Sequence, residues 1–326
     1  MRDRFYDNTR ISDFRTCPRK YYFRHALDWT YAGWTAALVF GSSWHEAMDT
    51  LWARLNSDNA QDLGTEDVVR EAYDAFLTCW MENNGPDPSD MDPDQIKQLE
   101  PRTPMIALEM LYEYVLERRE FIEKCELIAI EQPFAVPLDP TDDTLFYVGR
   151  LDKVVEYRGE VLVIEHKTTS LYRKDGPFRS TFVDSFSPNS QIDGYLHAIH
   201  SLYGKEAKAV WVDAALVHKK VHDGFKFIPI ERQIGQLESW LWSTRYWIDR
   251  MEMNWHAHDG MNGSSPYMPA FPQDPARCQD FARNCPYMDL CKAWSNPTDK
   301  ALPPGYAEEV WSPFDRLELE KIGLSR

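Results

Sequence analysis

Apolar residues recur along the chain with two periods, one typical of helices and one of strands. A stripe with helical spacing follows Ser43, and Glu46 three residues later completes a capping box. Similar stripes predict helices over 66–83 and 104–124. Runs rich in β-branched and aromatic residues predict strands at about 126–137, 145–157, 161–167, 208–218 and 224–231.

Start and stop signals predict three further helices. Ser12 is a candidate cap for an N-terminal helix that Pro18 interrupts. Ser187-Pro188 has Ser at the cap and Pro at the first helical position of a helix that ends near Gly204. A Trp-rich helix covers about 233–255. This order of elements favours an α/β fold with a mixed central sheet flanked by helices.

The strands at 145–157 and 161–167 flank Arg158-Gly159, a hairpin signal. If that dipeptide is the turn, Asp152 lies directly opposite Glu165, with Cβ atoms about 5 Å apart. Two carboxylates so close repel each other unless a cation such as Mg²⁺ or Mn²⁺ lies between them. Lys167 falls on the same face as Glu165. The alternative is a pair of surface strands with an acid on each by chance.

Charge and length say less about the function of the chain than this hairpin does. The chain has 326 residues, enough for one large domain or two modest ones, and a net charge of −16. That charge argues against a nucleic-acid partner only if it is evenly spread, and it is not. Residues 1–25 carry seven Lys or Arg against three Asp, whereas residues 82–100 carry six acids against one Lys. Without a long apolar run or an apolar N-terminal core, we expect a cytoplasmic protein with no membrane partner.

Three of the six cysteines are closely spaced, as Cys278-x6-Cys285-x5-Cys291. Cys17 is the candidate fourth ligand of a four-thiolate site. The spacing favours zinc, four thiolates also suit a [4Fe–4S] cluster, and the cysteines could instead be unpaired. Cys79 and Cys125 are expected to be small buried apolar residues.

Two other features have both a structural and a functional interpretation. Residues 15–24 interleave basic and aromatic side chains, which suits a nucleic-acid backbone or a helix that packs its rings inward. His45, near the start of its helix, is either a structural histidine or a metal ligand. Gln191 and Tyr195 are four apart and share one helix face.

Several motifs together resemble one family, the PD-(D/E)XK nucleases of the RecB-like branch. Within it the chain is similar to iron–sulfur exonucleases that include CRISPR-associated RecB-like proteins and the AddB nuclease domain. The matching motifs occur in family order: Ser12…Cys17-Pro18-Arg19-Lys20, Gly41-x-x-x-His45, Gly149-x-x-Asp152, Glu165-x-Lys167-Thr168, Gln191-x-x-x-Tyr195 and the cysteine trio with Cys285-Pro286-Tyr287.

The resemblance implies a role for each matching residue. His45, Asp152 and Glu165, with the backbone carbonyl of His166, would bind Mg²⁺ or Mn²⁺, and Lys167 would be the catalytic lysine. The pair Gln191 and Tyr195 would orient DNA or that lysine. The resemblance also reverses the preference for zinc, so that a [4Fe–4S] cluster is held by four cysteines: Cys17, Cys278, Cys285 and Cys291.

The resemblance also implies a domain organisation. Residues 1–295 would form a single restriction-endonuclease-like nuclease domain, followed by a tail at 296–326. Within that domain, 1–125 is mostly helical and holds the first cluster cysteine, 126–255 holds the catalytic sheet, and 256–295 is the cluster-binding segment. The four-cysteine region would join the N- and C-terminal parts.

The function that we expect is metal-dependent DNA exonuclease activity on single-stranded ends, with 5′ to 3′ polarity. A non-catalytic iron–sulfur DNA-binding or assembly factor in recombination or CRISPR adaptation is the alternative from another class, and a structural zinc protein is a further one. No helicase phosphate-binding motif is present, so the nuclease acts alone or with a separate helicase or recombination partner. Phage recombination, repair and CRISPR adaptation would share this chemistry.

Overall fold

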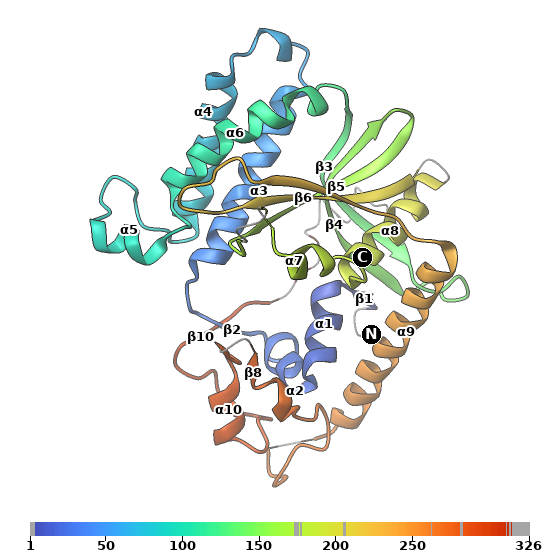
Figure 1. The fold of residues 1–326 in the computed structure, drawn as a ribbon. Coiled ribbons are helices and arrows are strands. Elements are labelled where there is room, and N and C mark those ends of the chain that lie inside the picture. The colour runs from blue at the N-terminus through green and yellow to red at the C-terminus, as the bar shows by residue number, and fades with distance from the viewer. Residues whose placement is uncertain are drawn as a thin grey trace. The chain divides into compact units, whose positions relative to one another are not determined.

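The computed structural model describes residues 4–172, 176, 178–204, 207–261, 263–280, 283–310, 312 and 314. The chain forms two compact units, each built from segments that are distant in sequence (Figure 1). We call Trp34–Phe134 with Arg150–Gln233 the hairpin unit. We call Met1–Gly33, Ala135–Gly149 and Ile234–Arg326 the cysteine unit. Of the expected tail at 296–326, residues 311, 313 and 315–326 lie outside the described residues.

A mixed sheet forms the centre of the hairpin unit, as the sequence predicted. Its strands follow the order β3-β4-β5-β6-β7. The β4–β5 and β6–β7 pairs are antiparallel, whereas β5 and β6 are parallel and are connected through α8. The bounds are β3 Glu126–Pro137, β4 Phe146–Tyr157, β5 Glu160–Thr169, α7 Ser180–Asp184, α8 Ser190–Tyr203, β6 Ala207–Leu216 and β7 Phe225–Ile230. The first residues of β4 and the last of β3 belong to the cysteine unit.

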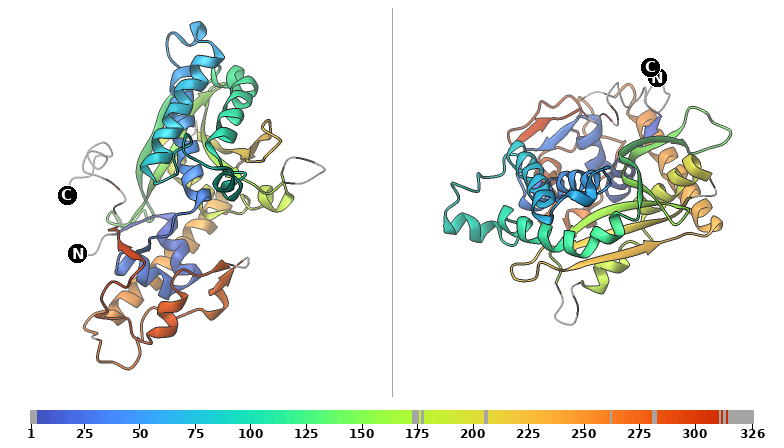
Figure 2. Two further views of the ribbon diagram at one scale, coloured as in Figure 1. Left: turned by 90° about the vertical axis from the view of Figure 1, so that its left-hand side faces the viewer. Right: turned by 90° about the horizontal axis from the view of Figure 1, so that it is seen from above.

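Helices cover both faces of this sheet (Figure 2). On one face, apolar side chains of α3, α4 and α6 form a continuous core with the sheet residues Val155, Leu162 and Ile164. On the other face, α8 packs against β5 and β6. The helices before the sheet are α3 Ala36–Leu55, α4 Thr65–Glu82, α5 Pro93–Leu99 and α6 Pro104–Ile122.

Two predicted helix starts in this unit are wrong. Helix α3 begins at Ala36, so Ser43 lies inside the helix, where its Oγ donates to the Val39 carbonyl at 2.9 Å. Helix α8 is capped by Asn189, whose side chain accepts from the backbone N–H of Gln191 at 3.0 Å, rather than by Ser187. The apolar run before Ser43 extends α3 towards its N-terminus, and for α8 Asn189 is a better cap than Ser187.

The cysteine unit contains short helical segments near its N-terminus and one long helix later in the chain, α9 Ile234–His258. Asp7 rather than Ser12 caps the first helix, because its side chain accepts from Arg10 N at 2.7 Å. Pro18 separates this helix from the next, as predicted. The remaining elements are β1 Phe5–Tyr6, α1 Asn8–Thr16, α2 Pro18–Tyr21, β2 Trp29–Tyr31, β8 Gln279–Asp280, β9 Arg283–Asn284, α10 Met288–Ala293 and β10 Tyr306–Glu308.

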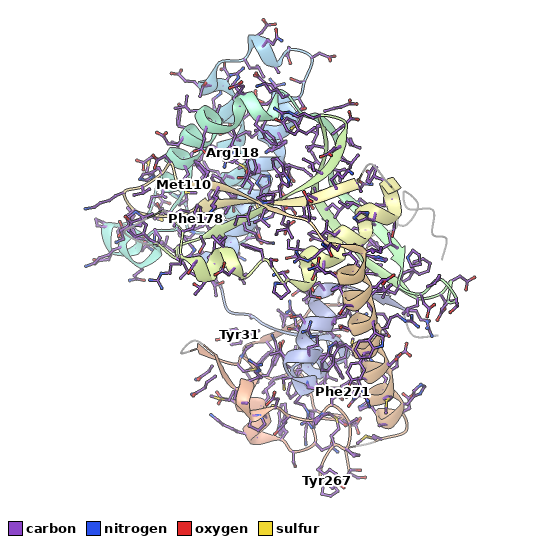
Figure 3. The ribbon with its side chains drawn as sticks, turned by 45° about the vertical axis from the view of Figure 1, so that its right-hand side comes forward. Tyr31, Met110, Arg118, Phe178, Tyr267 and Phe271 are labelled. Atoms are coloured by element: carbon purple, nitrogen blue, oxygen red, sulfur yellow. The ribbon has the colours of Figure 1, made fainter. Side chains whose placement is uncertain are left out.

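The aromatic residues of segment 15–24 pack inward. Tyr21, Tyr22 and Phe23 are each at most 2% exposed, and Phe271 stacks on Tyr21 with ring centroids 5.9 Å apart. Phe271 lies among the other side chains of the cysteine unit (Figure 3). The structural interpretation of this segment therefore holds, because buried rings cannot stack on nucleic-acid bases. Among the described residues, no helix combines the length and apolar character that crossing a membrane requires.

Candidate active site

The β4–β5 hairpin has the register that the sequence predicted. Arg158 and Gly159 form the turn with φ of 56° and 81°, both in the left-handed region of a two-residue hairpin turn. Lys153 pairs with Ile164, and one further step of the same register places Asp152 opposite Glu165. The two carboxylates thus come together on one face of the sheet.

Both acids are buried, and their surroundings shift their pKa values in opposite directions. Burial opposes ionisation of Asp152, but His45 and the nearby lysines outweigh it and hold its pKa well below the ordinary value. Burial, followed by the charge of Asp152, raises the pKa of Glu165 to about 7, although the ion pair with Lys167 acts in the opposite direction. Glu165 Oε2 is buried and has no hydrogen-bond partner among the described residues.

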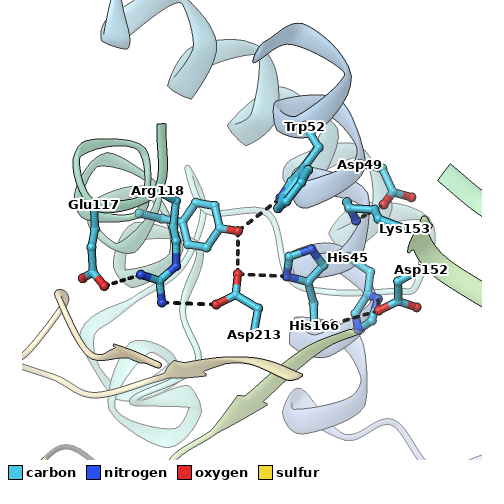
Figure 4. Close-up of polar contacts among 10 residues, drawn as sticks. His45, Asp49, Trp52, Glu117, Arg118, Asp152, Lys153, His166 and Asp213 are labelled. Atoms are coloured by element: carbon cyan, nitrogen blue, oxygen red, sulfur yellow. Dashed lines mark hydrogen bonds and ion pairs between the residues drawn. The ribbon is translucent and has the colours of Figure 1, made fainter. Parts of the chain in front are cut away.

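The backbone and α3 hold Asp152 in place. The N–H of His166 donates to Asp152 Oδ2 at 2.9 Å. His45 Nδ1 lies 3.2 Å from the same oxygen (Figure 4). Burial lowers the pKa of His45, but the charge and hydrogen bond of Asp152 more than compensate and raise it. This contact favours the functional interpretation of His45.

Glu131 of β3 belongs to the site, and the sequence interpretation missed it. One ligand atom from each of His45, Glu131 and Asp152 lies within 4.8 Å of the others, a grouping that could hold a metal ion. Burial, then the charges of Asp152 and Asp49, raise the pKa of Glu131 to about 7. The signal in the sequence was an acid inside the apolar strand AIEQPF, whereas its φ of 49° gave no sequence signal.

A second polar cluster lies on the sheet face under α3 and α6 (Figure 4). The buried Lys153 Nζ lies 2.7 Å from Asp49 Oδ1 on α3. The Tyr114 hydroxyl donates to Asp213 Oδ2 at 2.6 Å and accepts from Trp52 Nε1 at 3.1 Å.

The His166 ring belongs to this second cluster. It is fully buried, and its Nδ1 lies 3.6 Å from Asp213 Oδ2. Burial, followed by the charge of Lys153, lowers the pKa of the imidazole well below its ordinary value, so the ring is neutral. The expected role of the His166 carbonyl as a metal ligand stays a prediction.

Helix α8 brings Gln191 and Tyr195 together. Gln191 Nε2 donates to the Tyr195 hydroxyl at 3.0 Å, and the Tyr195 ring lies edge-on to Phe134. They share a helix face as predicted, while their action on DNA or on Lys167 stays a prediction.

The four clustered cysteines come together in the cysteine unit. Cys17, Cys278, Cys285 and Cys291 line one small cavity. The backbone N–H of Cys285 donates to the Cys278 carbonyl at 2.8 Å, which closes the loop between them.

The buried Arg19 is electrostatically close to two of these thiols, those of Cys17 and Cys291. Its Nη1 has no hydrogen-bond partner among the described residues. Outside this group, Cys125 is buried as predicted, whereas Cys79 is only partly buried.

A solved structure named "Putative exonuclease" from Eubacterium rectale superposes with a TM-score of 0.44 and 12% identity, and covers 77% of this chain and 80% of that one. The structure of SSO0001 superposes with a TM-score of 0.25 and 15% identity over 52% of this chain and 73% of that one. No curated protein matches the sequence. Residues 8–292 match the profile of the PD-(D/E)XK nuclease superfamily, and the chain belongs to this superfamily.

Proposed function

We propose that the protein is a metal-dependent DNA exonuclease that hydrolyses phosphodiester bonds at single-stranded ends in the 5′ to 3′ direction. One observation carries the proposal: Asp152 and Glu165 lie buried on one sheet face, and Lys167 forms an ion pair with Glu165. Membership of the nuclease superfamily supports the reaction class. The choice of DNA, its single-stranded form and the polarity rest on the resemblance to the RecB-like branch.

The residues present fit a divalent cation. Glu165 Oε2 is a buried oxygen without a partner among the described residues, and a cation would satisfy it. We assign the cation to Asp152, Glu165 and His45, with the His166 carbonyl. Of these, His45 and Asp152 group with Glu131 within 4.8 Å, which makes Glu131 an additional candidate ligand. Bound there, Mg²⁺ or Mn²⁺ would polarise the phosphate and lower the pKa of bound water.

The protein's own groups would provide the rest of the chemistry. The Lys167 ammonium would hold the attacking water or stabilise the charge that develops on the phosphate. Its ion pair with Glu165 fixes its position before substrate arrives. The Gln191–Tyr195 pair would orient the strand or the lysine. No covalent intermediate is needed.

We further propose that the four cysteines bind a [4Fe–4S] cluster, which places the chain in the RecB-like iron–sulfur branch. The side chains of all four line one cavity, and four thiolates suit either a zinc ion or a [4Fe–4S] cluster. The choice of the cluster rests on the resemblance to the iron–sulfur branch. The unpartnered Nη1 of Arg19 would offset the negative charge of the thiolates.

The test is cleavage of end-labelled single-stranded DNA in the presence of Mn²⁺ by anaerobically purified protein. We compare the wild type, Lys167→Ala, and Lys208→Ala as a control at an exposed strand lysine. The expected result is metal-dependent cleavage that Lys167→Ala loses and Lys208→Ala keeps. With 5′ to 3′ polarity, a 5′ label is released at once as short products, whereas a 3′ label gives a ladder.

Two results would contradict the proposal. The first is a Lys167→Ala variant as active as the wild type. The second is a well-folded, brown wild-type protein that binds DNA without cleaving it, which is the behaviour of the non-catalytic assembly factor.

A further inference from the structure

One side of α9 carries exposed aromatic side chains. Trp242 is 69% exposed and Tyr246 is 38% exposed. Their rings stack, with centroids 5.8 Å apart and planes inclined by 19°. The half-buried Trp247 meets Tyr246 edge-on at 5.3 Å. Most large rings of the cysteine unit are buried, so this exposed group of three needs an explanation.

Two arginines lie against these rings. The Arg250 guanidinium lies 5.1 Å from the centre of the Tyr246 ring, and Arg15 of α1 lies 5.7 Å from that of Trp247. Both arginines are exposed, and neither forms an ion pair with a described residue. Each therefore keeps its charge available to a ligand, although Arg250 Nη1 also donates to Met253 Sδ at 3.6 Å. We call Trp242, Tyr246, Trp247, Arg250 and Arg15 the α9 aromatic face.

Acidic residues are missing from the adjoining side of the helix. At 3.6 residues per turn, one side of α9 presents eight residues, none of them acidic. They are Gln236, Ser239, Ser243, Tyr246, Trp247, Arg250, Asn254 and Ala257. Glu238, one turn before Trp242, and Asp249, three residues after Tyr246, lie on the flank next to these rings. In a chain of net charge −16, a side about 30 Å long that carries two rings, Arg250 and no acid is suited to an anionic ligand with flat rings.

We propose that the α9 aromatic face binds single-stranded DNA. Unpaired bases would stack on Trp242 and Tyr246, while Arg15 and Arg250 would contact phosphates. Proteins that hold single strands without sequence preference combine these two elements, stacking rings and a basic track. Duplex bases cannot stack there because both of their faces are occupied within the helix. The choice of DNA rests on the proposed function, whereas the choice of an unpaired polyanion rests on the face itself.

The experiment measures binding of a fluorescein-labelled twenty-nucleotide oligothymidine by anisotropy, with full-length protein in the Lys167→Ala background to prevent cleavage. Trp242→Ala and Tyr246→Ala should each weaken binding about tenfold, the effect of losing one base–aromatic stack. Trp242→Phe and Tyr246→Phe keep a ring and should bind normally. Arg250→Gln should also make the slope of log affinity against log salt shallower by about 0.7, the value for one phosphate contact on a single strand.

The matched controls lie in the hairpin unit. Tyr112 has the same exposure as Tyr246, 38%, and Arg70 is an exposed helix arginine. Tyr112→Ala and Arg70→Gln should leave binding unchanged. An oligonucleotide that carries 5-iododeoxyuridine should cross-link, on irradiation, to the peptide that contains residues 242–247.

The outcomes separate this proposal from the proposed nuclease function. If the alanine variants bind oligothymidine as tightly as their parent, the α9 proposal is overturned, whatever the nuclease assay shows. It is also overturned if Trp242→Ala only dissociates a dimer and leaves DNA binding intact, since the face would then bind a second copy. If the wild type does not cleave DNA and the ring variants lose binding, the proposal for the α9 aromatic face holds and the nuclease proposal fails.

Discussion

The fully buried ammonium of Lys153 forms an ion pair with Asp49 at 2.7 Å. Lys153 is the strand neighbour of Asp152, and Asp49 lies one helical turn after His45. The pair therefore ties the strand that supplies one candidate metal ligand to the helix that supplies another. Because this ion pair holds α3 against β4, His45 reaches Asp152 without a flexible loop.

We expect Lys153→Met to destabilise the protein by about 3 kcal/mol, because it leaves the Asp49 carboxylate without its buried partner. Lys153→Met combined with Asp49→Leu should recover much of that loss, since both charges are then gone. Urea unfolding measures both, and Lys208→Met at an exposed position of β6 is the control. A loss of under 1 kcal/mol for Lys153→Met would show that the pair has no structural role.

Glu131→Gln should weaken Mn²⁺ binding at least about tenfold, because a neutral amide replaces a charged ligand beside Asp152. Calorimetric titration of Mn²⁺ and the Mn²⁺ dependence of cleavage measure the effect. Glu126→Gln changes an exposed acid of the same strand and should bind Mn²⁺ normally. Equal affinity of Glu131→Gln and wild type would remove Glu131 from the ligand set.

Local sequence signals were enough to predict the hairpin but not everything around it. The turn at Arg158-Gly159 and the period of two predict the register that pairs Lys153 with Ile164, and one further step of it brings Asp152 opposite Glu165. By contrast, Glu131 joins the site through a left-handed backbone conformation that no local pattern encodes. Lys153 has the sequence character of a surface lysine, and its burial depends on Asp49, which lies 104 residues away.

The aromatic residues show a second limit of sequence reasoning. Segment 15–24 and helix α9 both mix rings with basic residues, yet Phe23 is fully buried and Trp242 is mostly exposed. Composition cannot distinguish the two cases, because exposure depends on which elements pack against each helix. Helix starts failed for a related reason: Ser12 had a cap-like sequence, but Asp7 made the stronger capping contact.

Glu131 and Glu165 should make metal-free stability fall as the pH rises from about 5 to 7. Their pKa values are raised to about 7, so between their ordinary value of 4.5 and 7 these two groups bind more protons in the folded protein than in the unfolded chain. Their contribution to the free energy of unfolding then decreases with pH. The raised pKa of His45 acts in the same direction, because its stabilising charge is lost as the pH rises. The lowered pKa of the buried His166 acts in the opposite direction below its ordinary value of 6.5.

Mn²⁺ should remove most of this pH dependence, since it binds the ionised carboxylates and stabilises the folded state more at pH 8 than at pH 5.5. Thermal unfolding at both pH values, with and without Mn²⁺, measures the difference. Glu165→Gln should flatten the metal-free profile. A metal-free melting temperature that rises between pH 5.5 and 7 in the wild type but not in Glu165→Gln would contradict the assignment.

The hydrogen bonds around Asp213 should contribute to stability rather than to chemistry. Asp213→Ala removes the β6 partner of the buried Arg118, which keeps its ion pair with Glu117, and should cost about 1–3 kcal/mol. Tyr114→Phe removes one hydrogen bond to Asp213 and should cost about 1–2 kcal/mol. Tyr112→Phe, on an exposed part of the same helix, is the control. Denaturant unfolding measures the free energy of unfolding of each variant. Equal stability of all three variants would contradict a structural role for these hydrogen bonds.

The cysteines offer the clearest test of the cofactor. Burial raises the pKa of Cys291 to about 11, so a thiolate at neutral pH needs a metal to stabilise it. Cys17→Ser and Cys291→Ser should therefore lose the bound iron and its visible absorption, whereas Cys79→Ser and Cys125→Ser in the hairpin unit should keep both. Elemental analysis of anaerobically purified protein distinguishes the metals. About four iron atoms per chain would support a [4Fe–4S] cluster. One zinc atom per chain that Cys17→Ser loses would contradict the cluster and show a zinc site instead, because a single zinc ion can bind the same four thiolates.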